Sequence, residues 1–405
     1  MSYMVTSGLF ILRRPLPVRT AYLRVRYAST KSCDPLRILF CGSDSFSIAS
    51  LKALCRERAN SPETIASIDV VCRPGKRVGR GLKTIREVPI KAAATQLSLP
   101  IHEIDTFTGW KPPKPQGDPI NLIIAVSFGL FVPPRILNAA KYGGLNVHPS
   151  LLPDFRGPAP LHHTLLAGET RTGVTLQTLD TRDFDHGVIL DQTPPPGFSI
   201  PDPDTCDVPR LLDLVSDKSA QMLVSGIRNR IFVPPLKSAG WRKPDNEGAL
   251  RHAGKIQPED RHINWRSWTA QEIFRRQRVL GPLWNNVVIG TGSSISGSNE
   301  QTKRVIFTKM ALDESIPRVL DSVKIDPGVV FTLSDAQTSA NELDQPLYVT
   351  TCDRKTLRID EIKVQGQHSA PAYRAAKKAN MLNIEPPSVS LSINPWRVLN
   401  NTGLV

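Results

Sequence analysis

The stretch Asn146–Leu161, which reads NVHPSLLPDFRGPAPL, constrains the fold more than any other part of the chain. It follows the apolar run Ile120–Val126, whose length and turn-rich borders predict a strand buried on both faces of a parallel sheet. Pro149, Pro153 and Gly157 then predict a stiff loop with irregular backbone. In open α/β sheets, ligands bind beyond the carboxyl ends of such strands. The sequence therefore predicts an α/β fold with its functional site at this loop.

Two polar side chains stand at the start of this stretch. The short apolar piece Gly144–Val147 predicts another strand, and alternate positions on a strand point to the same side. Asn146 and His148 are such alternate positions. An amide donor beside an imidazole suits oxyanion stabilisation and proton transfer in acyl transfer. Taken alone, this pair fits a packing or capping role better than catalysis, so a functional assignment also requires the other motifs of the chain.

The N-terminal part is typical of a doubly wound βαβ unit. Leu36–Cys41 predicts the first strand, 45–56 a helix capped by Asp44 or Ser45, and Asp69–Cys72 the second strand. Gly42 has no partner glycines two and five residues later, which disfavours a nicotinamide cofactor. Further helices are expected over 88–97, 133–140, 162–167 and 208–228, and further strands at 100–101, 173–179 and 188–190, with a surface loop over 110–118.

The charge balance favours a polyanionic partner. The chain of 405 residues has a formal net charge of +14. Residues 1–32 contain six basic residues and no acidic residue, so the remainder still carries about +8. An arginine-rich, serine-containing and acid-free leader is typical of a mitochondrial transit peptide, and its apolar part is too short to span a bilayer. A basic tail that stays attached is the alternative.

The cysteines do not indicate a metal site or a disulfide framework. The chain has six cysteines, scattered and without a C-x-x-C pair, so a reducing compartment and no metal are expected. Cys41 and Cys72 stand in strand-like apolar runs, where small buried residues are expected.

A basic segment follows the second predicted strand. Residues 73–83 read RPGKRVGRGLK and show no apolar periodicity, which predicts a mobile loop. Basic side chains on flexible backbone can neutralise phosphates of a nucleic acid, although a merely solvated basic loop is equally compatible with the pattern. The residues that would bind are Arg73, Lys76, Arg77, Arg80 and Lys83.

A loop with three aspartates follows the predicted strand 173–179. Asp185 comes directly before the pair His186-Gly187, whereas Asp180 and Asp183 are expected to cap or solvate the turn. The adjacent His162 and His163 are expected to be surface or packing residues.

The last third of the chain changes character. Residues 233–247 read as a linker, a helix is expected over 270–279, and five short strands with turn-rich spacers predict a small β-barrel. The strands are expected at 284–289, 305–311, 328–333, 347–352 and 356–364, with loops at 313–324 and 335–345 and a final helix over 370–380. Basic residues on both helices suit contact with an RNA backbone.

The motifs together resemble one family. The run 146–161, then Thr172–Thr175 and Asp185–Gly187, resembles the folate-dependent formyltransferases, which use 10-formyltetrahydrofolate. The resemblance covers roughly residues 36–380 and is greatest to the branch that formylates initiator methionyl-tRNA. It implies a Rossmann-like doubly wound parallel sheet (the formyltransferase fold) followed by an OB-like C-terminal barrel.

The resemblance also assigns site residues. Asn146, His148 and Asp185 correspond to the catalytic Asn, His and Asp of the family, and Arg156 would anchor the loop or the substrate. The basic segment resembles a loop of pattern P-x-x-x-x-G-R-G that grips the acceptor arm, with Arg80 at its key arginine; here glycine stands at position 75, where bacterial sequences usually have Asp. The folate would contact Ser127, Phe128, Gly129, Leu130, Ser150, Leu151, Leu152 and Pro153.

The expected protein is therefore a formyltransferase of the mitochondrial matrix, monomeric, without membrane contact, with folate and initiator methionyl-tRNA as partners. The expected domains are a transit peptide (1–32), a catalytic domain (33–232), a linker (233–247), a tRNA-binding barrel (248–385) and a tail (386–405). The alternatives are a sister enzyme that acts on glycinamide ribonucleotide, a sugar nucleotide or water, and an RNA-binding protein without catalysis.

Overall fold

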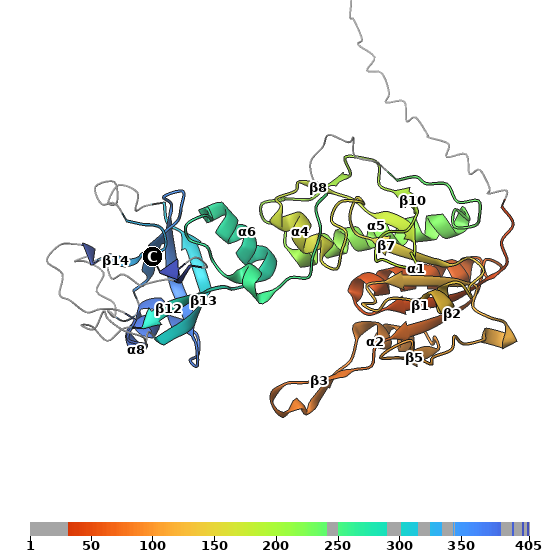
Figure 1. The fold of residues 1–405 in the computed structure, drawn as a ribbon, viewed down its shortest axis with the longest axis horizontal. Coiled ribbons are helices and arrows are strands. Elements are labelled where there is room, and N and C mark those ends of the chain that lie inside the picture. Colours follow the sequence, from red (N-terminus) through yellow and green to blue (C-terminus); the bar gives the residue numbers. More distant parts are fainter. Residues whose placement is uncertain are drawn as a thin grey trace, which may run out of the picture.

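The structure is a computed structural model, and it shows two seven-stranded sheets joined by a helix (Figure 1). It describes residues 31–240, 250–289, 301–314, 325–333, 343, 345–381, 391–392, 399–400 and 403–404. Residues 1–30 of the predicted transit peptide, residues 241–247 of the predicted linker and most of the predicted C-terminal tail lie outside the described residues. Among the described helices, none combines the length and the apolar character that a bilayer span requires.

The first sheet has seven strands in the order β10-β9-β7-β6-β1-β2-β5. The five strands from β7 to β5 are parallel, as predicted. β9 and β10 run antiparallel at one edge, a feature that the prediction of a doubly wound parallel sheet did not include. A single loop joins β9 to β10, and so short a connection suits antiparallel neighbours. The strands are β1 (Leu36–Gly42), β2 (Ile65–Cys72), β5 (Ile101–Glu103), β6 (Leu122–Val126), β7 (Gly144–His148), β9 (Thr175–Thr178) and β10 (Ile189–Gln192).

Both faces of this sheet are covered, which explains the unbroken apolar runs in its central strands. Ile38 and Phe40 point into one core and Leu39 and Cys41 into the other. The first core is closed by α1 (Ser45–Asn60), which packs against α5 (Val208–Arg228), and by α2 (Pro89–Gln96) and α4 (Pro160–Leu166). The second is closed by α3 (Pro134–Leu137) and its flanking loops.

The predicted helix cap and the predicted buried cysteines are both present in the structure. The side chain of Asp44 accepts a hydrogen bond from the backbone N–H of Ser47 at 3.1 Å and so caps α1. Cys41 and Cys72 are buried, and burial raises the pKa of both thiols, that of Cys72 to about 11. All six cysteines are free.

The basic segment is a β-hairpin, not the irregular loop that its sequence predicts. β3 (Lys76–Val78) pairs antiparallel with β4 (Thr84–Arg86), and a 3-10 turn (Arg80–Leu82) joins them. The hairpin projects from the body of the first unit (Figure 1). Leu82 and Ile85 are more than half exposed, which explains why no apolar periodicity marked these strands.

The C-terminal unit contains an antiparallel sheet in the order β12-β13-β16-β15-β14-β18, with β17 paired to β16. Its core begins at Ile263, and α8 (Ala372–Lys378) packs on β16. In the described residues no ladder closes the sheet, so the OB-like barrel stays a prediction, as do the domain limits. The strands are β12 (Leu283–Ile289), β13 (Gln301–Leu312), β14 (Val330–Leu333), β15 (Leu347–Thr350), β16 (Thr356–Val364), β17 (Ala370–Pro371) and β18 (Leu391–Ser392).

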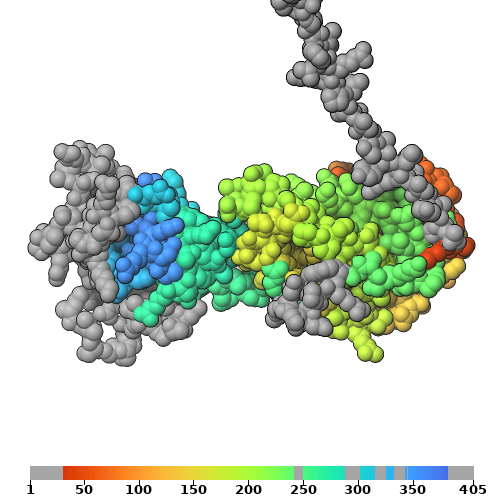
Figure 2. Space-filling model, turned by 90° about the horizontal axis from the view of Figure 1, so that it is seen from above, coloured from red at the N-terminus to blue at the C-terminus, as the bar shows by residue number. Residues whose placement is uncertain are grey.

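Helix α6 (Ala270–Leu280) joins the two units. It packs against α4, and Val279 and Leu280 are buried in the core of the first unit. Figure 2 shows this green-to-teal segment between the yellow-green first unit and the blue strands. The remaining short elements are β8 (Arg171–Thr172), β11 (Phe198–Ser199), β19 (Leu399–Asn400), β20 (Gly403–Leu404) and the 3-10 turns Pro115–Gly117 and Pro258–Arg261.

Candidate active site

Strand β7 delivers Asn146 and His148 to the same side of the sheet, as their alternate positions predict. β7 lies between β6 and β9, and Asn146 stands opposite Gln177 of β9 in the ladder. His148 is 5% exposed. A strand held on both edges fixes the position of these side chains better than a free loop would.

Asp185 meets both residues from the loop between β9 and β10. Its Oδ1 accepts a hydrogen bond from Asn146 Nδ2 at 2.9 Å and another from Gln177 Nε2 at 3.2 Å. His148 Nδ1 lies 3.4 Å from the same oxygen. The backbone of Asp185 is left-handed, with φ +57°, and the surrounding donors hold it there. The three residues that the resemblance assigns to catalysis therefore form one cluster.

The loop Asp154–Ala159, here called the catalytic loop, holds the other side of this cluster. The carbonyl oxygen of Phe155 lies 2.9 Å from His148 Nε2, and because a carbonyl only accepts, Nε2 carries the hydrogen. Gly157 N donates to Asp185 Oδ2 at 3.2 Å, and Arg156 Nε donates to the backbone oxygen of Asp185 at 2.7 Å. Arg156 is thus an anchor for the loop that carries the acid.

A cavity of about 940 Å³ opens in front of the cluster. Asn146, His148 and Asp185 all line it. The predicted folate-contacting residues on one side of it are Ser127, Phe128, Gly129 and Leu130. Ser127 and Gly129 have positive φ angles of 48° and 75°, so this turn follows an unusual path around the cavity.

The second predicted folate segment, Ser150 to Pro153, is not among the residues that line the cavity. Ser150 donates to the carbonyl oxygen of Asp154 at 2.8 Å, and Leu152 N donates to Thr175 Oγ1 at 3.2 Å. Ser150 and Leu152 are each 1% exposed. This segment is therefore a buried support of the catalytic loop; it consists of Ser150, Leu151, Leu152 and Pro153.

Other polar residues near the cavity divide into capping and lining groups. Asp180 accepts from the backbone N–H groups of Asp183 and Arg182, and these bonds lower the pKa of its carboxyl group. His162 lines the cavity, and burial, together with the positive charges of His163 and Arg261, lowers its pKa. His162 is thus half-buried at the wall of the cavity, and its prediction as a surface or packing residue stays a prediction.

Sequence reasoning missed three lining groups. Gln177 is buried on β9, and its only signal was its place in an alternating strand. Phe184 is 59% exposed beside Asp185, and its ring meets that of Phe131 edge to face at 5.2 Å. His252 reaches the cavity from far along the chain, so no local pattern could reveal it.

The predicted tRNA-binding residues lie away from this cavity. Lys76, Arg77, Arg80 and Lys83 are exposed on the hairpin, and no ion pair within the described residues engages them. Arg73 precedes the hairpin and lies 3.4 Å from Asp105. Within the described part of the chain, no group of three potential ligands is placed to hold a metal ion.

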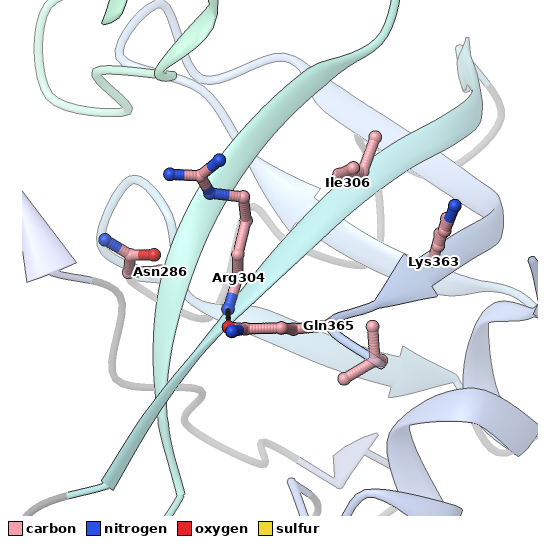
Figure 3. Close-up of a pocket in the computed structure, with 6 residues that line it drawn as sticks. Asn286, Arg304, Ile306, Lys363 and Gln365 are labelled. Atoms are coloured by element: carbon pink, nitrogen blue, oxygen red, sulfur yellow. Dashed lines mark hydrogen bonds between the residues drawn. The ribbon is translucent and has the colours of Figure 1, made fainter. Parts of the chain in front are cut away.

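A smaller hollow of about 380 Å³ lies on the C-terminal sheet (Figure 3). Arg304 of β13 lies between Asn286 of β12 and Lys363 of β16, and its backbone N–H donates to Gln365 Oε1 at 3.1 Å. Its guanidinium lies 4.1 Å from the ring centroid of Trp284. Two of the residues that line this hollow, Arg304 and Lys363, are basic.

Residues 36–207 match the formyl transferase family. That match and the clustered Asn, His and Asp side chains define an enzyme of the formyltransferase class.

Sequence identity to individual proteins shows which branch of the formyltransferase class the chain belongs to. The chain is 33% identical over 332 residues to the mitochondrial methionyl-tRNA formyltransferase of Saccharomyces cerevisiae, with 73% of this chain and 80% of the relative covered. It is 34% identical over 274 residues to that of Homo sapiens, with 66% and 64% covered. A solved N-formyltransferase from Helicobacter canadensis, crystallised with folinic acid and dTDP-3-aminofucose, aligns with a TM-score of 0.47 at 14% identity over 80% of this chain and 98% of its own, which adds nothing to the assignment. The chain belongs to the methionyl-tRNA formyltransferase family and is a mitochondrial member of it.

Proposed function

We propose that this protein transfers the formyl group of 10-formyltetrahydrofolate to the α-amino group of methionine on initiator tRNA in the mitochondrial matrix. The single observation that carries the proposal is the contact of Asn146, His148 and Asp185 at the wall of the cavity. These residues supply a hydrogen-bond donor, an imidazole and a carboxylate, the groups that acyl transfer to an amine requires. With these groups the proposed reaction needs no metal ion.

Asn146 would stabilise the intermediate. The amine nitrogen attacks the formyl carbon, and the resulting tetrahedral intermediate carries a negative oxygen. Nδ2 of Asn146 has two hydrogens, so it can donate to Asp185 Oδ1 and to this oxygen at the same time. A positioned donor of this kind contributes about 3 kcal/mol to the stability of the transition state.

His148 and Asp185 would move the protons. Since Nε2 is held by the carbonyl oxygen of Phe155, Nδ1 is the ring atom that can exchange a proton with Asp185. Asp185 would help remove a proton from the attacking amine, and His148 would pass a proton to N10 as the bond from the formyl carbon to N10 breaks. The products are formyl-methionyl-tRNA and tetrahydrofolate, and the protonation of the site is restored.

The cavity has a wall suited to the folate. The turn Ser127–Leu130 lines it next to Asn146, and its backbone groups can pair with the edge of a pterin ring. Because residues 150–153 lie outside the lining, the folate would contact the protein at this turn and not at that segment.

Two basic surfaces would hold the tRNA. The hairpin exposes Lys76, Arg77, Arg80 and Lys83 on backbone that projects from the enzyme, where they can neutralise phosphates. The hollow around Arg304 and Lys363 on the C-terminal sheet adds two cations, which can neutralise further phosphates of the RNA backbone.

The test is an acceptor panel. Purified protein would be mixed with 10-formyltetrahydrofolate labelled in the formyl group and with charged initiator methionyl-tRNA, uncharged tRNA, glycinamide ribonucleotide or no acceptor. The proposal predicts label on the charged tRNA alone. Label on the ribonucleotide, or release of free formate, would assign the protein to a sister activity, and tight tRNA binding without any turnover would make it an RNA-binding protein.

A further inference from the structure

Residues Arg251–Gly254, here called the strap, lie against the catalytic loop although they are about 100 positions away in sequence. Phe155 N donates to the carbonyl oxygen of Arg251 at 2.6 Å, and Ala253 N donates to that of Arg156 at 2.8 Å. Ala159 N donates to the carbonyl oxygen of Ala253 at 3.2 Å. The strap thus pairs with the loop much as a neighbouring strand would.

Side chains fasten the strap at both ends. Arg251 Nη2 lies 3.2 Å from Asp154 Oδ2, and Nη1 contacts Glu169. The guanidinium also covers the ring of Phe155 at 4.3 Å. At the other end, His163 Nε2 donates to the carbonyl oxygen of Gly254 at 2.9 Å. Ala253, in the middle, is fully buried.

Two of the three backbone hydrogen bonds of the strap involve residues that also contact His148 or Asp185. The strap holds the N–H of Phe155, and the carbonyl oxygen of the same residue holds His148 Nε2. It also holds the carbonyl oxygen of Arg156, whose side chain holds the backbone of Asp185. The two residues that orient the imidazole and the acid are therefore themselves oriented by the strap.

Gly157 shows how close the two segments are. Its φ is +125°, and a Cβ atom built on it would lie 2.4 Å from the carbonyl oxygen of Ala253. Backbone cannot yield to such a contact without moving, so the position is reserved for glycine as long as the strap is in place.

We propose that the strap is a positioning element of the active site: it holds the catalytic loop in the form that orients His148 and Asp185. This inference rests on the proposed function for its kinetic readout. The strap leads into the C-terminal unit through Pro258–Arg261. The match to the formyl transferase family ends at residue 207, so the geometry of the reacting groups depends on a segment outside that match. Arg251 acts through the loop and does not touch the reacting atoms.

The first variant is Arg251→Ala in the full chain, with Arg251→Lys as the conservative variant and Arg266→Ala, an exposed arginine of the same unit, as the matched control. Misplacement of reacting groups lowers kcat more than it raises KM. We expect Arg251→Ala to lower kcat about tenfold with KM for both substrates within about twofold, Arg251→Lys to recover part of the loss, and Arg266→Ala to have wild-type kinetics. Gly157→Ala should lose about 100-fold in kcat, because its Cβ forces the two segments apart.

A second measurement does not depend on turnover. Nitrogen-15 NMR of the His148 ring reports whether Nε2 carries the hydrogen that the Phe155 carbonyl accepts, and hydrogen exchange reports the opening of the Phe155 and Ala159 amides. In Arg251→Ala these amides should exchange at least about tenfold faster, and the His148 ring signals should shift or broaden. If the wild-type protein transfers no formyl group, the proposed function fails, but this measurement still decides the role of the strap.

Two results would overturn the proposal. One is a wild-type kcat, with unchanged His148 signals, in both Arg251→Ala and Gly157→Ala. The other is a lower melting temperature in Arg251→Ala with full kcat well below that temperature, which would make the strap a stabilising contact only.

Discussion

Asn146 Nδ2 and Asp185 Oδ1 lie 2.9 Å apart and share a hydrogen bond. Asn146 comes from β7, inside the sheet, and Asp185 comes from the loop between β9 and β10, so the bond joins a strand to a loop. Gln177 and Gly157 donate to the same carboxylate. A carboxylate with this many donors is held in one orientation before any substrate binds, which is the condition for efficient catalysis.

Replacing Asn146 tests its role as the oxyanion donor. We expect Asn146→Ala to lower kcat by a factor of about 10² to 10³, because the developing negative charge loses a positioned donor. KM for the folate and for the tRNA should change by less than about threefold, since the donor acts on the transition state and not on bound substrate. Steady-state kinetics with each substrate varied would check this, and a loss confined to KM would contradict it.

Gln177 provides a test of a residue that sequence reasoning missed. Gln177→Leu keeps the side chain near its volume but removes the 3.2 Å hydrogen bond to the Asp185 carboxylate. A hydrogen bond to a charged group contributes about 1.5–3 kcal/mol, so we expect kcat to fall about ten- to a hundredfold. Gln221→Leu, on the exposed side of α5, is the matched control and should leave kcat unchanged.

The hairpin should account for part of the salt dependence of tRNA binding. Replacing Lys76, Arg77, Arg80 and Lys83 with alanine removes four exposed cations. For each phosphate that is no longer neutralised, the slope of log K against log salt should become shallower by about 0.7–0.9. Filter binding of the tRNA over a range of salt concentrations would measure the slope. Lys52→Ala, an exposed lysine on α1, should leave it unchanged, and an equal effect of both variants would reject the hairpin as a binding site.

His162 should titrate below the usual range of a histidine. Burial and the charges of His163 and Arg261 lower its pKa, so the native state binds fewer protons at this residue than the unfolded state does. The free energy of unfolding should therefore fall as pH falls through the ordinary imidazole range. NMR titration of the ring gives the midpoint, and His162→Gln should remove this part of the pH dependence. A midpoint at or above the ordinary value would contradict the prediction.

Much of the fold was predictable because burial leaves a pattern in the sequence. The runs that became β1 and β6 are apolar on both faces, and α1 carries its cap at Asp44. The reversed direction of β9 was not predictable, because a strand pattern does not encode direction. The hairpin was missed because its residues are exposed on both faces and follow no apolar period.

The residues of the candidate site also divide into those that the sequence could predict and those that it could not. The period of β7 placed Asn146 and His148 together, and the resemblance to a known family supplied Asp185. Gln177 and the strap could not be found from the sequence, because their positions depend on which distant segments the fold brings side by side. The barrel of the C-terminal unit and a monomeric state stay predictions.

The central claim is that Asn146, His148 and Asp185 form the catalytic centre, and single-turnover formyl transfer to charged initiator tRNA tests it most directly. With enzyme in excess, the rate reports the chemical step, while filter binding shows whether the tRNA is still held. We predict that His148→Ala and Asp185→Asn each lose at least about 100-fold in this rate and bind the tRNA as the wild-type protein does. Transfer at the wild-type rate by either variant would contradict the account.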